Sequence, residues 1–165
     1  MKLPRLFTVA ALSLTVLAAQ AGVIRFPENR PAVSINIPDS WSPETLPKGV
    51  MAESPDGVAT LVFEFAKSEK DLDGVIDENI DWLIKEHGVR INAKSKQEDK
   101  GAAGGIASDI LFYDANHKEY GPARVGFMFT PVKGGVLVTT FWISKDGASK
   151  NMGAINRILS TVRPL

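Results

Sequence analysis

Alternation of apolar and polar residues in the N-terminal third of the chain predicts strands. In residues 32–37 the valine and the two isoleucines share one side, as in a half-buried strand, and Pro38 ends the segment. Residues 50–54 are predicted to form a short strand. Residues 58–66 are apolar on both sides, a pattern typical of a central strand that is covered on both faces.

Apolar residues then recur at helical spacing, which predicts a first helix that begins at Ser68. The Ser68 side chain can cap this helix, with Asp71 three residues later in a capping-box arrangement, and Gly88 supplies the stop. The same spacing near the end of the sequence predicts a last helix that begins at Ser149 and ends before Pro164.

Between the two helices the pattern returns to a period of two residues and predicts two hairpins. The predicted strands are residues 89–98, 105–114, 122–132 and 136–144, joined by glycine-rich turns at 101–105 and 133–135. This order predicts an α+β fold, an antiparallel β-sheet with the two main helices packed on one face. The last strand is apolar on both faces, so the N-terminal strands, a partner or a ligand should cover the other face.

The first 21 residues have the pattern of a secretory signal peptide. Lys2 and Arg5 give a basic start, residues 6–19 are mostly apolar, and small residues precede a cleavage site after Ala21. The apolar run is shorter than the roughly 20 residues that a membrane-crossing helix needs. We therefore expect an exported protein whose mature part, residues 22–165, is a single α+β domain.

The chain contains no cysteine, which excludes disulfides, zinc–thiolate sites, thiol catalysis and lipid attachment at an N-terminal cysteine. It also has no Asn-x-Ser/Thr acceptor for glycosylation. With the signal peptide, these absences favour a bacterial periplasm. Cleavage would remove Lys2 and Arg5 from the 19 basic residues and none of the 19 acidic residues, leaving a net charge of about −2. Such a charge gives no electrostatic case for binding nucleic acid or an anionic membrane.

Histidine chemistry is limited to two residues. His117 lies among carboxylates in the segment 114–120, but a catalytic zinc site usually needs three protein ligands in a rigid frame, so a polar hairpin loop explains the segment better. His87 is expected in the last turn of the first helix, where a cation interacts favourably with the helix dipole. No serine lies in a Gly-x-Ser-x-Gly elbow. We therefore predict no catalytic residue, no metal site, no cofactor and no enzymatic activity.

Two tryptophans are the candidate binding residues. Trp82 lies off the apolar stripe of the first helix, beside Asp81, where partial burial at the helix edge is the favoured interpretation. The alternative is that Trp82 anchors a partner or an apolar ligand, because exposed tryptophan is enriched in binding hot spots. Trp41, close to two prolines, is expected to rim the same kind of groove.

Three features together resemble a known group of proteins. A strand ends in the sequence from Ile37 to Trp41, an amphipathic helix is followed by two hairpins, and the chain closes on the segment from Ile155 to Arg163. Over residues 32–163 this pattern resembles the PsbP-like group, which includes the extrinsic photosystem protein, a nuclear-import factor that binds a small GTPase, and bacterial DcrB-type proteins. The resemblance implies an α/β/α-type sandwich and members that mostly bind or assemble. It provides no catalytic residues.

Three functions are therefore considered, in this order. The first is a periplasmic, non-enzymatic binding or accessory protein that engages a protein partner, or else a small-molecule ligand, through the apolar sheet face or a groove rimmed by Trp41 and Trp82. The second is an immunity or inhibitor protein that neutralises a toxin. The third is a periplasmic hydrolase that uses His117 with the acidic residues around it.

Overall fold

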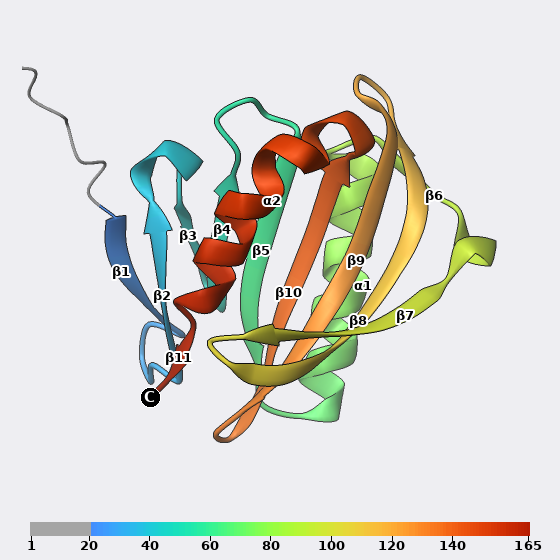
Figure 1. The fold of residues 1–165 in the computed structure, drawn as a ribbon. Coiled ribbons are helices and arrows are strands. Elements are labelled where there is room, and N and C mark those ends of the chain that lie inside the picture. The colour runs from blue at the N-terminus through green and yellow to red at the C-terminus, as the bar shows by residue number, and fades with distance from the viewer. Residues whose placement is uncertain (1–20) are drawn as a thin grey trace, which may run out of the picture.

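The computed structural model describes residues 21–165 (Figure 1). The signal peptide predicted for residues 1–21 lies, apart from Ala21, outside the described residues. In chain order the elements are β1 (Ala21–Phe26), β2 (Val33–Pro38), the 3₁₀ helix η1 (Asp39–Trp41), β3 (Glu44–Leu46), β4 (Gly49–Glu53), β5 (Ala59–Ala66), α1 (Glu69–Lys85), β6 (Val89–Ile91), the 3₁₀ helix η2 (Ala93–Ser95), β7 (Gln97–Ala103), β8 (Ile106–His117), β9 (Gly121–Val132), β10 (Gly135–Ser144), α2 (Lys145–Ser160) and β11 (Arg163–Pro164). No helix in this part of the chain is long and apolar enough to cross a membrane.

The strands form two antiparallel sheets. The large sheet has eight strands in the order β3-β4-β5-β10-β9-β8-β6, and β7 also pairs with β8. The first half of β8 pairs with β7, and its last three residues pair with β6. The small sheet has the order β1-β2-β11, so that β2 is flanked by the first and the last strand of the described chain.

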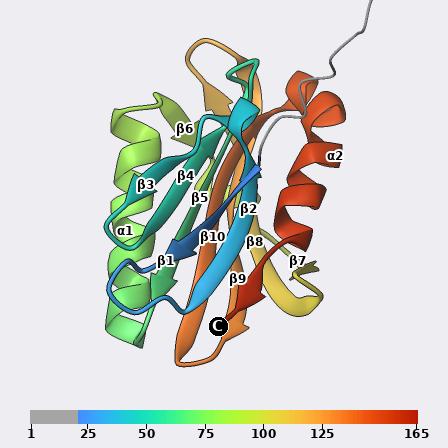
Figure 2. The same ribbon diagram turned by 90° about the vertical axis from the view of Figure 1, so that its left-hand side faces the viewer.

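The two helices lie on opposite faces of the large sheet (Figure 2). Val138 and Trp142 of β10 pack in the clusters beneath α1, whereas Leu137 and Ile143 belong to the larger cluster that includes α2 and the small sheet. The prediction that both faces are apolar is confirmed, and each face is covered over most of its area. The prediction that both helices share one face is wrong, because the apolar stripe of α1 fills its face alone and leaves the other face to α2 and β2.

The predicted central strand is confirmed. Every residue of β5 is buried, and β5 lies between β4 and β10 in the large sheet. The apolar side of β2, formed by Val33, Ile35 and Ile37, is also buried, and it contributes to the cluster shared with α2. These strands fix the position of α2 over the sheet.

The N-terminal ends of both helices differ from the sequence prediction. Ser68 caps α1 as predicted and accepts a hydrogen bond from the Asp71 N–H, but the Asp71 carboxylate accepts from the Lys67 N–H, one residue before the position of a capping box. α2 begins at Lys145, four residues before the predicted Ser149, and is capped by Ser144. The first turn of α2 is polar, so it lacks the apolar spacing on which the prediction depended.

The tip of the β7–β8 hairpin is held against the C-terminal end of α2. The predicted turn narrows to Gly104 and Gly105, both of which have positive φ angles (59° and 82°). The Gly104 N–H donates a 2.8 Å hydrogen bond to the Leu159 carbonyl oxygen, one of the last carbonyls of α2. A Cβ atom at Gly104 would lie 1.9 Å from the Val162 carbonyl oxygen, so only glycine permits this approach.

A buried carboxyl group lies under α1. Glu64 of β5 is 9% exposed, and its Oε2 accepts a 2.7 Å hydrogen bond from the Asn79 side-chain amide, which also donates to the Val75 carbonyl oxygen. Burial raises the pKa of Glu64 above its ordinary value, and the Asn79 hydrogen bond and the charge of Lys48 only partly oppose this effect. The ionised form is therefore penalised in the folded protein.

We expect Glu64→Gln to make the protein more stable than wild type at neutral pH. A raised folded-state pKa means that the folded protein binds this proton more strongly than the unfolded chain, so the contribution of Glu64 to stability falls as pH rises through the two pKa values. Glutamine removes the charge and still accepts a hydrogen bond from Asn79. Thermal unfolding between pH 4 and 8 should show the two proteins converging at low pH. The exposed control Glu53→Gln should follow wild type, and a destabilised Glu64→Gln protein at pH 7 would contradict the argument.

Candidate binding groove

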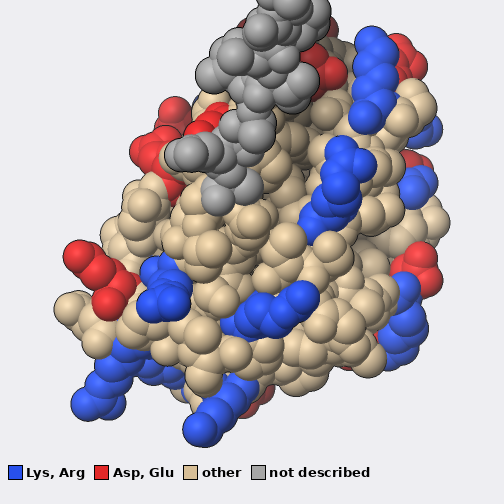
Figure 3. Space-filling view, turned by 60° about the vertical axis from the view of Figure 1, so that its left-hand side comes forward, with Lys and Arg blue, Asp and Glu red and all other residues tan. Residues whose placement is uncertain are grey.

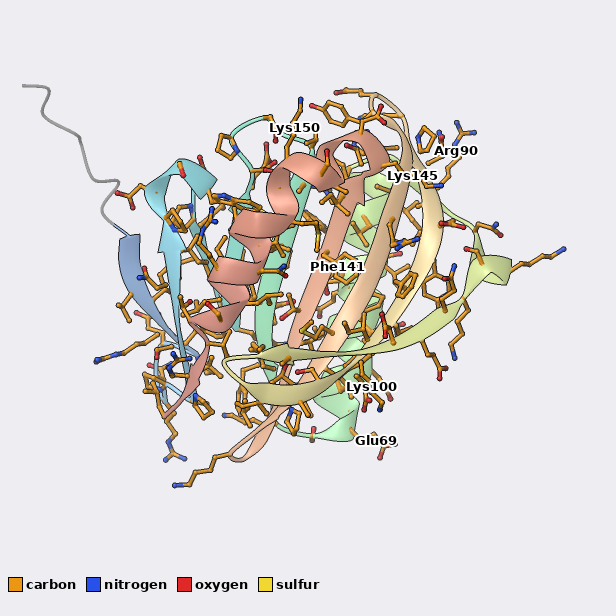
Figure 4. The ribbon with its side chains drawn as sticks, viewed as in Figure 1. Glu69, Arg90, Lys100, Phe141, Lys145 and Lys150 are labelled. Carbon is orange, nitrogen blue, oxygen red and sulfur yellow. The ribbon has the colours of Figure 1, made fainter. Side chains whose placement is uncertain are left out.

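A groove of about 570 Å³ runs between α2 and the strands β7 to β10. In Figure 1, α2 crosses the sheet on the side of β4 and β5, and β7 passes in front of β9 and β10 on the same face. The labelled Phe141 side chain extends from β10 into the space between α2 and the β7–β8 hairpin (Figure 4). The principal apolar lining residues are Leu61, Ile110, Phe112, Met128, Phe141, Ile143, Ala148, Met152, Ile155 and Leu159.

The floor of the groove follows from strand alternation. Ile110, Met128 and Thr139 are cross-strand neighbours on β8, β9 and β10, and their side chains point to the α2 face. Phe141 lies opposite Gly126 of β9. A Cβ atom at Gly126 would lie 2.7 Å from Phe141 Cζ, so the glycine lets the aromatic ring lie close to β9.

One polar side chain interrupts this floor. Thr139 is 2% exposed, and its hydroxyl has no hydrogen-bond partner among the described residues. A buried hydroxyl without a partner costs stability, typically about 1–3 kcal/mol in proteins. The hydroxyl oxygen is itself buried, so it lies within the packed floor and does not face an occupant of the groove.

Two cationic side chains lie at one end of the groove. Arg124 is exposed, and its guanidinium lies 4.5 Å from the centroid of the Phe112 ring. Ile143 pairs with Arg124 and is followed two residues later by Lys145, the first residue of α2. Within residues 21–165, neither cation has a carboxylate partner within 4.0 Å. Asp99 is the acidic residue among those that line the groove.

The predicted binding tryptophans do not line this groove as a pair. Trp41 is 3% exposed and belongs to the cluster on the α2 side of the sheet, so it does not rim a surface groove. Trp82 is half-buried at the edge of α1, as its favoured interpretation had it, and packs on the opposite face near Trp142. Sequence reasoning missed the groove because its lining residues have the same apolar alternation as an ordinary core.

Both histidines belong to an aromatic cluster around Trp142. The His117 ring stacks on Trp142 with 4.6 Å between centroids, and the His87 ring lies 4.1 Å from that of Trp82. His117 is the last residue of β8 and is 4% exposed, and its Nδ1 accepts hydrogen bonds from the Glu119 and Tyr120 N–H groups. The prediction that residues 114–120 form a loop is therefore wrong for 114–117.

Burial lowers the pKa of both histidines. For His87 the positive charges of His117 and Lys118 add to this effect, and for His117 the charge of Glu119 opposes it. The prediction that His87 lies in the last turn of the first helix is wrong, because α1 ends at Lys85. Burial also disfavours the cationic form of His87 that an interaction with the helix dipole requires. Among the described residues, no group of three or more His, Asp or Glu side chains is placed to hold a metal ion.

Basic side chains are dispersed over one face of the molecule. On the face that carries the small sheet and α2, Lys and Arg side chains lie as separate points on a mostly uncharged surface (Figure 3).

A second hollow, of about 610 Å³, lies beside the β7–β8 hairpin. Its lining includes the exposed residues Glu98, Lys100 and Asp109, and Lys100 already pairs with Asp109. This hollow is therefore a weaker candidate site than the apolar groove.

No family model matches the chain, and a comparison with curated proteins finds no match. Among solved structures, the solution structure of cyanobacterial PsbP (CyanoP) from Synechocystis matches with a TM-score of 0.53 and 10% identity, over 94% of this chain and 100% of that chain. The chain has the PsbP-like fold. The resemblance inferred from the sequence is thus confirmed for the fold.

Two further structures match less closely. LpqN of Mycobacterium tuberculosis, described as involved in cell envelope biogenesis, has a TM-score of 0.45 and 16% identity, over 88% of this chain and 90% of that chain. PA94 of Pseudomonas aeruginosa, described as a protein of unknown function, has a TM-score of 0.38 and 15% identity, over 88% of this chain and 97% of that chain.

Proposed function

We propose that this PsbP-like protein is a non-enzymatic binding protein and that the groove beneath α2 is its binding site. The observation that carries the proposal is a groove of about 570 Å³ with a mainly apolar floor, within the size range of about 300–1,000 Å³ typical of ligand sites. The partly exposed Met152 at its edge adds apolar surface that the fold itself does not bury. The signal-like residues 1–21 support export, and cleavage after Ala21 would leave β1 almost complete.

Coverage of the sheet by the helices and the small sheet limits how a partner could bind. A protein partner was expected to dock on an apolar sheet face, but α1 occupies one face, and α2 and the small sheet occupy most of the other. The groove is the part of that face that stays open, and it favours a narrow ligand over a broad protein surface. The buried, stacked position of His117 gives no support to a hydrolase that uses it. No observation favours the immunity function.

The test is binding of N-phenyl-1-naphthylamine, an uncharged probe whose fluorescence rises in apolar sites. We expect wild-type protein to bind it and Ala148→Phe to lose binding, because Ala148 lines the groove and a phenyl ring there would fill it. The control is Ser149→Phe, which adds the same ring at the next, exposed position of α2. Circular dichroism would verify that both variants fold. Absence of binding to wild type, or equal binding by Ala148→Phe, would refute the proposal.

A further inference from the structure

We infer that the groove holds a single fatty-acid chain, with the carboxylate beside Arg124 and Lys145 and the methyl end beneath the C-terminal end of α2. This inference rests on the proposed function, because it names the ligand class of the same groove.

The length and the apolar lining of the groove suit one extended hydrocarbon chain. The groove follows α2 from Lys145 to Leu159, fourteen residues or about 21 Å at the rise of an α-helix. A peptide strand on this apolar floor would bury backbone N–H and C=O groups that find no partner there, whereas a hydrocarbon chain has no polar groups to satisfy.

The two ends of the groove differ in chemistry. At the Leu159 end, the hydrogen bond from Gly104 to Leu159 holds the hairpin tip against α2, and the lining residues Ala102 and Ile155 are apolar. This end suits a methyl terminus. At the other end, Arg124 and Lys145 are both exposed to solvent, so a charged group placed there keeps much of its hydration.

The charges at the open end favour an anion. Lys145 occupies the first turn of α2, where a cation interacts unfavourably with the helix dipole, so the stability of α2 does not account for it. Asp114 lies opposite Arg124 in the strand register and Asp146 follows Lys145, but no ion pair within 4.0 Å involves either acid in the described part of the chain. Both cations are therefore available to a ligand carboxylate. Asp99, the acidic residue that lines the groove, pairs with Ile110, which lies four residues along β8 from Asp114. Asp99 is therefore about 13 Å along the sheet from the position opposite Arg124.

Competition between dodecanoate and dodecanol tests the inference, because the two ligands share a chain and differ in charge. Each would displace N-phenyl-1-naphthylamine from protein that was expressed as the full chain and stripped of lipid. We expect dodecanoate to bind about tenfold more tightly than dodecanol, because one charge-assisted hydrogen bond contributes roughly the binding free energy of a tenfold difference in affinity. Arg124→Gln and Lys145→Gln should each reduce this preference, whereas Lys150→Gln, an exposed cation of α2 outside the groove, should leave it unchanged.

Two outcomes would overturn the inference. One is equal affinities for dodecanoate and dodecanol, and the other is an effect of Lys150→Gln equal to those of Arg124→Gln and Lys145→Gln. In each of these cases probe binding to wild type would still uphold the proposed function, which fails only if the uncharged probe does not bind in the groove.

Discussion

Trp142→Ala should lower the free energy of unfolding by about 4 kcal/mol, the largest loss that we expect from a single substitution in this protein. Trp142 is 2% exposed and packs in one cluster with Leu83, Val89 and Val125 beneath α1. Its ring is also the surface on which His117 stacks. Alanine would leave a large cavity between β10 and α1, because close-packed strands cannot move together to fill it.

Urea unfolding followed by circular dichroism would measure this loss. The matched control is Trp82→Ala, since Trp82 belongs to the same cluster but lies half-buried at the edge of α1, where solvent can occupy the space that the ring leaves. We expect a loss of about 1 kcal/mol for the control, near the average for point mutations. Equal losses for the two variants would mean that the cluster is not organised around Trp142.

Gly104→Ala should cost about 3 kcal/mol of stability. A left-handed backbone costs a non-glycine residue roughly 1–2 kcal/mol. The added Cβ atom would also approach the Val162 carbonyl oxygen to 1.9 Å, so the hairpin tip must move away from α2 and lose the hydrogen bond to Leu159. The same displacement would open the closed end of the groove.

Gly105→Ala is the control for this prediction. Gly105 also has a positive φ angle, 82°, but a Cβ atom there would meet nothing within 4 Å. The control therefore measures backbone strain alone, and the difference between the two variants measures the contact with α2. Urea unfolding of both proteins provides the comparison, and similar losses would show that the contact between hairpin and helix contributes little.

Much of the fold follows from periodicity alone. The strands around residues 33–37, 59–66, 122–132 and 136–144 were predictable because each alternates, or is apolar throughout, over its whole length. The face on which α2 lies was not predictable. Alternation in β10 shows that both faces need a cover, but which helix covers which face depends on packing against distant strands.

The candidate site was harder to predict than the fold. Ile110 and Phe141 have the sequence pattern of ordinary core residues, and nothing local indicates that α2 lies too far to one side to bury them fully. The prediction for His117 was wrong in the opposite sense, since a buried residue was expected to be exposed. Its polar neighbours suggested a loop, but its own ring is buried against Trp142. In both cases, the element that determines whether the residue is buried lies far away in the sequence.

The small sheet ties the earliest part of the described chain to the latest. β2 cannot gain its second neighbour before residues 163 and 164 are available, and the Asn36 N–H donates to the Thr161 hydroxyl, 125 residues away. Contacts across such a separation close a long loop and are slow to form. A chain that emerges from the ribosome N-terminus first must therefore keep β2 incomplete until synthesis is nearly finished. The small sheet is therefore the last part of the fold that can be completed, whichever elements form before it.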